Sequence, residues 1–267
     1  MLIEKFFPLK SNTYLNLNKL FVKIGSKIDE IGLIQLFSLW TLTVAGVVFE
    51  MGLINRSVYW DWSNWKIGLS KLFFVTVVFI LFLNPKGLWN IDSKRLSARS
   101  ICIHMIIAFM CLLFGYSASL NNLIFLIPYL LAFYSGLLIF QFQIQLNTET
   151  KTWFSIDWEN KIYILLTSFL SMLISVIIGI YLDDPILSTS AMVSTPFPLI
   201  ALLWPDHVRH LQRARFYPLF IFSMFLCVRA PWFLIPLIML FIFFRVVNYF
   251  RFGIAHPSFG VDFAEEK

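Results

Sequence analysis

The sequence predicts an all-α fold, a polytopic bundle of about eight transmembrane helices, on three observations. Hydrophobic residues make up 59% of the 267 residues and charged residues 13%, whereas about 25% of a soluble domain is charged. Long runs contain no Asp, Glu, Lys or Arg, and roughly 20 apolar residues suffice to cross a bilayer. Basic residues gather in the short segments between these runs. The runs are Ile31–Phe49, Leu72–Pro85, Ser100–Thr148, Ile162–Leu182 and Pro185–Pro205.

Eight spans follow from the lengths of the runs. The run at 100–148 holds two spans, because one helix of that length would far exceed the roughly 30 Å of hydrocarbon, and we expect the break at Asn121-Asn122. The segment from Arg229 to Trp232 is either a tight hairpin turn or a kink in one long tilted helix, since Pro removes a backbone donor. The expected spans are 32–54, 65–85, 100–120, 122–145, 162–182, 186–205, 215–229 and 230–249.

The distribution of charge orients the bundle. With a cytoplasmic N-terminus, all but four of the 21 Lys and Arg residues fall on the cytoplasmic side, as the positive-inside rule requires. Residues 1–30 carry lysines and no compact apolar core with a cleavage site, so we expect no cleavable signal peptide. We expect an integral protein of the inner (plasma) membrane of a bacterium or archaeon. The four exceptions are Arg56, Lys66, Lys71 and Arg229.

The chain divides into three expected regions. Residues 1–30 form a basic N-terminal segment, which is either an interfacial amphipathic helix on an anionic leaflet or an ordinary basic leader. Residues 31–249 form the transmembrane helical domain, and residues 250–267 form a cytoplasmic C-terminal tail.

Two classes of function are excluded by charge and cysteine usage. The net charge of +6 comes from loops beside hydrophobic helices, so the positive-inside distribution explains it and we expect no nucleic-acid partner. Cys102, Cys111 and Cys227 lie in apolar spans without ligand spacing, which argues against a disulfide framework or a zinc site.

Three polar loops fall on the cytoplasmic side, at 83–99, 146–161 and 206–215. Together they could surround an anionic headgroup, because the planar guanidinium of arginine binds two phosphate oxygens at once. The alternative is that they are solvated positive-inside loops with no ligand.

Histidines give weaker signals. His104, near the start of the third span, either contacts a ligand headgroup or is a neutral hydrogen-bonded histidine. His207 and His210 lie three residues apart, but a zinc site needs three or four ligands of fixed geometry.

Four stretches resemble one family. Residues 36–46, LFSLWTLTVAG, are similar to its opening helix, and the second span runs into the Asn- and Asp-bearing loop 83–99. Residues 145–161 sit where a second acidic loop is expected, and residues 215–262 are similar to the last helices and tail. On these stretches the chain resembles a divergent member of the UbiA superfamily of intramembrane prenyltransferases.

The resemblance implies a helical bundle around a lipid-facing cavity and transfer of a prenyl group from its diphosphate to an aromatic or lipid acceptor. Mg²⁺ is the implied cofactor, because family members hold it against the diphosphate with two aspartate-rich motifs. The implied metal and catalytic residues are Asp92 and Glu149. The implied diphosphate-binding residues are Asn90, Lys94, Arg95, Arg99 and Arg209, and the implied tunnel-lining aromatic residues are Trp40, Phe133 and Tyr134.

The aspartate-rich motifs are degenerate here. Asp92 is the only carboxylate of loop 83–99, and two basic residues follow it. The alternative function is therefore a non-catalytic membrane subunit or lipid-binding scaffold, with membrane lipids or an isoprenoid as its ligand. A small transporter is a third hypothesis, favoured only by STSAMVSTPFP at 188–198, where Ser and Thr can also satisfy the backbone around the prolines without transport.

Overall fold

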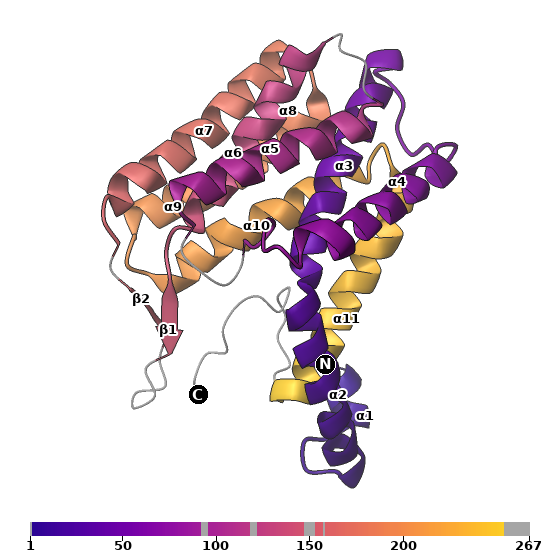
Figure 1. Cartoon of the computed structure of the whole chain (residues 1–267), viewed down its shortest axis with the longest axis vertical. Coiled ribbons are helices and arrows are strands. Elements are labelled where there is room, and N and C mark those ends of the chain that lie inside the picture. The colour runs from indigo at the N-terminus through magenta and orange to yellow at the C-terminus, as the bar shows by residue number, and fades with distance from the viewer. Residues whose placement is uncertain (1, 92–95, 118–121, 147–152, 157, 254–267) are drawn as a thin grey trace.

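The computed structural model describes residues 2–91, 96–117, 122–146, 153–156 and 158–253. Apart from a two-stranded hairpin, the described chain is helical, as the sequence predicts. Helices from the middle of the chain lie side by side in a tilted body, and a narrower arm extends from this body (Figure 1). The arm consists of the N-terminal helices and the C-terminal end of the last helix.

Six helical segments of the described chain are long and apolar enough to cross a membrane. They coincide with six of the expected spans, so the prediction of a polytopic helical membrane protein is confirmed. The segments are α3 (Leu33–Ile54), α4 (Trp65–Val78) continued by the π-helix η1 (Phe79–Leu83), α5 (Ala98–Gly115), α7 (Lys161–Tyr181), α8 (Pro185–Ser194) with α9 (Pro196–Leu203), and the 3-10 turn η3 (Pro231–Phe233) with α11 (Leu234–Phe252).

The expected span 122–145 is wrong at its C-terminal end. Its helix, α6, covers Ile127–Ile139 and follows the 3-10 turn η2 at Leu123–Leu126. The chain then leaves the helix because β1 (Ile144–Leu146) pairs antiparallel with β2 (Trp153–Ser155). Pairing with a partner strand thus replaces the last helical turns that hydropathy alone predicts.

The expected span 215–229 differs at its N-terminal end, since α10 covers Val208–Leu226 and begins before residue 215. A turn at residues 227–230 separates α10 from η3, and the backbone N–H of Ala230 donates to the carbonyl of Leu226 over 3.0 Å. α11 leaves this turn in a different direction from α10 (Figure 1). A turn, and not a kink in one helix, therefore joins the last two helices, which diverge from it instead of pairing as a hairpin.

The helix pair α8 and α9 is interrupted at Thr195. The Thr195 hydroxyl donates to the carbonyl of Ala191 over 2.8 Å, and Pro196 opens α9. The hydroxyl supports the backbone at a proline break, as expected if this stretch has a packing role.

α3 and α5 cross at close range through two glycines. A Cβ atom placed on Gly46 would lie 2.2 Å from the carbonyl oxygen of Leu112, and one on Gly115 would lie 2.0 Å from that of Thr43. Small residues allow this approach between the backbones of membrane helices.

α6 and α7 are joined by reciprocal hydrogen bonds between buried serines. Ser135 Oγ donates to the carbonyl of Ser168 over 2.7 Å, and Ser168 Oγ donates to the carbonyl of Ser135 over 2.8 Å. Such interhelical bonds contribute about 0.6 kcal/mol on average in a membrane protein. They hold one face of α6 on α7 and leave another face for α3 and α10.

The arm is built by α1 (Leu2–Phe6), α2 (Asn12–Ile31) and the end of α11. Asn18 Nδ2 donates to the carbonyl of Phe250 over 2.7 Å, and Phe21 stacks on the Phe250 ring with centroids 4.8 Å apart. The segment is helical, as the amphipathic alternative requires. Its placement on an anionic leaflet stays a prediction.

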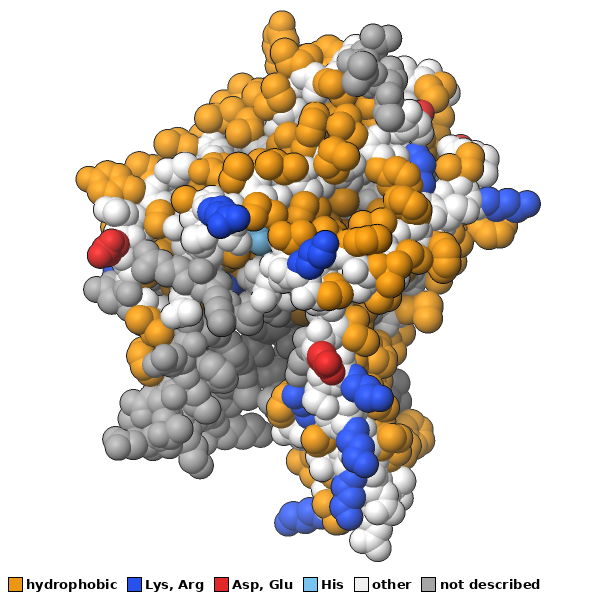
Figure 2. Space-filling view, in the orientation of Figure 1, with side chains coloured by type: hydrophobic (Ala, Val, Ile, Leu, Met, Phe, Trp, Pro, Cys, Tyr) orange, Lys and Arg blue, Asp and Glu red, His pale blue; other side chains and the backbone are white. Residues whose placement is uncertain are grey.

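Surface chemistry differs between the arm and the body. Basic side chains gather along the arm, whereas apolar side chains cover much of the visible body (Figure 2). Lys19, Lys23 and Lys27 recur every four residues along α2 and are exposed. Because soluble proteins rarely expose large contiguous apolar patches, the surface of the body is typical of helices that face lipid.

Candidate functional site

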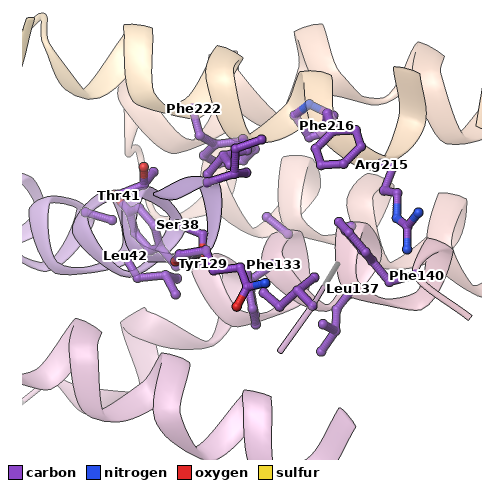
Figure 3. A pocket seen from close by; sticks show the side chains of 18 of the residues that line it. Ser38, Thr41, Leu42, Tyr129, Phe133, Leu137, Phe140, Arg215, Phe216 and Phe222 are labelled. Carbon is purple, nitrogen blue, oxygen red and sulfur yellow. Dashed lines mark hydrogen bonds between the residues drawn. The ribbon is translucent and has the colours of Figure 1, made fainter. Parts of the chain in front are cut away.

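An apolar cavity of about 110 Å³ lies between α3, α6 and α10 (Figure 3). Its walls include Leu42, Phe133, Leu137, Phe216 and Phe222. One water needs about 10–15 Å³ and two to four polar partners. A space of this volume with apolar walls therefore suits an alkyl or prenyl chain better than water.

The hydroxyl groups in the cavity wall are bonded within the protein. Ser38 Oγ donates to the carbonyl of Gln35 over 2.6 Å and accepts from Trp89 Nε1 over 3.1 Å. Thr41 Oγ1 donates to the backbone of its own helix over 2.9 Å and lies 2.9 Å from Ser223 Oγ. These bonds leave the cavity surface largely apolar.

Arg215 contributes a buried cation at one end of the cavity. Its side chain lies beside Phe140 in Figure 3, and the residue is 7% exposed. The guanidinium carbon lies 4.0 Å from the centre of the Phe140 ring and 4.8 Å from that of Phe142. Contact with ring faces offsets part of the cost of burying the charge. Since ionisable residues inside membrane domains are typically functional, Arg215 is the main candidate residue.

Tyr129 lines the cavity near the opposite end of α6 from Phe140. Its hydroxyl donates to Asp184 Oδ2 over 2.5 Å. Asp184 in turn accepts from the backbone N–H groups of Ile186 and Leu187, over 3.2 Å and 3.1 Å, at the start of α8. The Tyr129 hydroxyl is therefore bonded to the residue that caps the N-terminus of α8.

Four of the predicted site residues lie outside the described residues. These are Asp92, Lys94, Arg95 and Glu149. Their contacts with Mg²⁺ and with a diphosphate stay predictions.

The other three predicted residues lie on three different elements. Asn90 is exposed between η1 and α5, and its Oδ1 accepts from Gln35 Nε2 over 3.5 Å. Arg99 is exposed in the first turn of α5, and Arg209 is half-buried in the first turn of α10. None of these three residues lines the cavity. Asn90 is connected to it only indirectly, because its partner Gln35 lines the cavity.

Of the three aromatic residues predicted to line a tunnel, one lines the cavity and two do not. Phe133 lines the cavity, whereas Trp40 and Tyr134 are not part of its lining. Trp40 Nε1 instead donates to Thr76 Oγ1 over 3.0 Å and joins α3 to α4. For this cavity the prediction is therefore wrong for Trp40 and Tyr134. The indole N–H of Trp40 has a partner on the neighbouring helix instead.

Gln35, Tyr129 and Arg215 were not singled out together by the sequence. Gln35 is the only amide in the first apolar run, and Arg215 directly precedes an apolar stretch, so both carried a signal. Tyr129 carried none, because a tyrosine within a span is ordinary packing in most membrane helices.

His104 is packed and hydrogen-bonded within the protein. His104 is 1% exposed, its Nδ1 lies 2.6 Å from the carbonyl of Ser100, and its ring packs 5.0 Å from that of Trp89. His104 therefore matches the alternative of a hydrogen-bonded histidine.

The rings of His207 and His210 lie 4.3 Å apart. The pKa of His210 is lowered, chiefly by partial burial and then by nearby positive charge. Within the described part of the chain, no group of three or more His, Cys, Asp and Glu residues could hold a metal ion.

Comparisons with protein-family models, with curated proteins and with solved structures find no match for the chain. The cavity is therefore interpreted from its own geometry and charge.

Proposed function

We propose that this chain is an integral membrane protein that binds an anionic amphiphile, either a phospholipid or an isoprenoid phosphate. The apolar chain of the ligand occupies the cavity between α3, α6 and α10, and its phosphate lies at Arg215. The observation that carries the proposal is a buried guanidinium at the end of a largely apolar cavity.

The walls of the cavity support the apolar half of the proposal. Each buried methylene contributes about 0.8 kcal/mol. Three helices supply apolar side chains to the same space, among them Leu42, Leu137 and Phe222. Because the wall hydroxyls of Ser38 and Thr41 already have partners, a hydrocarbon chain would displace no hydrogen bond from them.

The surroundings of Arg215 support the anionic half. A guanidinium can bind two phosphate oxygens through parallel hydrogen bonds. Stacking on Phe140 and Phe142 restrains the guanidinium before a ligand arrives, which reduces the entropy lost on binding. The backbone N–H of Leu96 donates to the carbonyl of Phe140 over 3.4 Å. The residue that follows the basic loop segment 92–95 thus lies at the Arg215 end of the cavity.

Prenyl transfer is the narrower proposal, and it rests on the resemblance to the UbiA superfamily together with this position of Leu96. Asp92 and Glu149 would then hold Mg²⁺, which neutralises the charge of a departing diphosphate. Without transfer, the same cavity serves a non-catalytic lipid-binding scaffold. Incubation with Mg²⁺, labelled prenyl diphosphates and a lipid extract separates the two. Transfer that Asp92→Ala abolishes supports the enzyme, and the absence of transfer by the unaltered protein supports the scaffold.

Amphiphile binding is tested on purified protein in detergent by native mass spectrometry. The probe is dioleoyl phosphatidylpropanol, a phosphodiester lipid with one negative charge. We expect Arg215→Gln to weaken its binding by about tenfold or more, because hydrogen bonds to charged groups contribute about 1.5–3 kcal/mol. Lys19→Gln removes one exposed charge from α2 and should leave binding unchanged. Equal weakening by both substitutions would indicate nonspecific charge attraction and contradict the proposal.

A further inference from the structure

A second, more polar hollow opens beside the cavity, and we name it the amide groove. It has a volume of about 330 Å³ and lies between the junction of α2 with α3, the segment after η1, and α11. Ile34 and Gln35 line both the groove and the cavity, so the two spaces meet at the first turns of α3. The polar side chains that line the groove are Glu30, Gln35, Asn84 and Asn90.

The wall of the amide groove is held against α3. Trp89 is fully buried, and its Nε1 donates to the carbonyl of Gln35 over 3.0 Å. Its ring stacks on Phe133 with centroids 5.8 Å apart. Asn84 Nδ2 donates to the carbonyl of Ile31 over 3.0 Å. These contacts hold the backbone at Gln35 and the amide of Asn84 in place before any ligand binds.

The chemistry of the groove suits hydroxyl groups. Side-chain amides both donate and accept hydrogen bonds, and the carboxylate of Glu30 accepts them and repels a phosphate. The described residues that line the groove include no Lys or Arg. The bond from Gln35 to Asn90, at 3.5 Å, is long, so a hydroxyl group can replace it at little cost.

We infer that the amide groove is a second subsite, which binds the hydroxyl-bearing part of a headgroup whose phosphate lies at Arg215. The inference rests on the proposed function, because the groove adjoins the cavity through Gln35. The ligand class is a phosphodiester lipid with free headgroup hydroxyls. The cavity holds its chain, Arg215 its phosphate and the amide groove its hydroxyls.

The inference is tested with two dioleoyl lipids of equal charge, phosphatidylglycerol and phosphatidylpropanol, which differ only in the two headgroup hydroxyls. By native mass spectrometry, the unaltered protein should bind phosphatidylglycerol about tenfold more tightly, the effect of one or two added hydrogen bonds. Equal affinities would overturn the subsite and leave the role of Arg215 standing. If Arg215→Gln weakens neither lipid, the proposed function fails instead.

Variants locate the effect. Asn90→Ala should lower the affinity for phosphatidylglycerol to that for phosphatidylpropanol, and its unchanged binding of phosphatidylpropanol reports an intact cavity. Asn16→Ala, at an exposed asparagine of α2, is the matched control and should keep the preference. A tenfold preference that survives in both Asn90→Ala and Asn90→Leu would overturn the inference. Soluble glycerol 3-phosphate should not displace the lipid, and its displacement of the lipid at equal concentration would overturn the assignment to a lipid.

Discussion

The guanidinium carbon of Arg215 lies 4.0 Å from the centre of the Phe140 ring. The two residues come from different helical elements, since Arg215 lies within α10 and Phe140 directly follows α6. A cation over a ring face gains electrostatic attraction that is strongest where water is excluded. The contact therefore joins two helices and also holds the charge at the end of the cavity.

Phe140→Leu keeps an apolar side chain but removes the ring face. We expect it to weaken binding of dioleoyl phosphatidylpropanol by about two- to tenfold, less than Arg215→Gln, because ordering a long side chain on binding costs about 0.5–1.5 kcal/mol once the ring no longer restrains it beforehand. Titration by native mass spectrometry measures the effect. Phe73→Leu, on an exposed face of α4, is the control and should leave affinity unchanged. An unaltered affinity of Phe140→Leu would mean that the ring does not position the guanidinium.

Gly46→Ala should destabilise the protein, because the added methyl group would lie 2.2 Å from the carbonyl oxygen of Leu112 and push α3 from α5. Overpacking of this kind costs about 1–3 kcal/mol, which should appear as a lower thermal unfolding midpoint in detergent. Gly136→Ala is the matched control, since a Cβ atom there meets nothing within 4 Å. It should leave the midpoint unchanged or raise it, because Ala favours a helix over Gly by roughly 0.5–1 kcal/mol. Equal midpoints for the two variants would argue against the close crossing.

Trp60 should lie at a membrane interface. It is 59% exposed in the loop between α3 and α4, which also exposes Tyr59 and Trp62, and Trp65 is exposed at the start of α4. Aromatic residues concentrate at the headgroup level. In vesicles, lipids brominated close to the headgroup should quench a larger part of the tryptophan fluorescence of the unaltered protein than of Trp60→Phe. Trp232→Phe removes an indole that is 1% exposed and should leave the quenched part nearly unchanged. Quenching that Trp60→Phe does not reduce would place the loop away from the interface.

The pKa of Asp61 is lowered because Ser63 donates to its carboxylate twice, from the backbone N–H over 2.8 Å and from the hydroxyl over 2.7 Å. Ser63→Ala removes the hydroxyl bond and should raise the pKa part of the way toward its ordinary value of 3.8. Since the folded-state pKa is depressed, these bonds stabilise the fold above that value and lose their effect as the pH falls through the folded-state pKa. NMR titration with carboxyl-labelled aspartate measures the change. An unshifted pKa in Ser63→Ala would show that the hydroxyl bond does not form in solution.

Most of the helical architecture was predictable because each span is a local property of the chain. A helix in lipid satisfies its backbone hydrogen bonds within its own segment, so composition and length are enough to locate α3 or α7. The error after Ile139 has the opposite cause. β1 needs β2 as a partner, and a pairing between separate segments leaves little trace in the hydropathy of either one.

The candidate site was predictable only in outline. Charge directed attention to the polar loops, and Arg215 stood at the edge of one of them. The role of Arg215 depends on its contact with Phe140. In the sequence, Phe140 is indistinguishable from the other apolar residues near the end of a span. Trp40 shows the reverse case, since an aromatic residue expected in a tunnel bonds to Thr76 on the adjacent helix.

The sequence by itself determined that this is a membrane protein of several helices with basic loops, because transfer of apolar segments into lipid depends on composition summed over about 20 residues. Only the tertiary structure decided which helices enclose the cavity, and that Gln35 lies where the cavity and the amide groove meet. Helices in lipid have no hydrophobic drive toward one another, so small residues and hydrogen bonds set their neighbours, as at Gly46 and Ser135. Those contacts join residues far apart in the chain, and their effect exists only once the helices have packed.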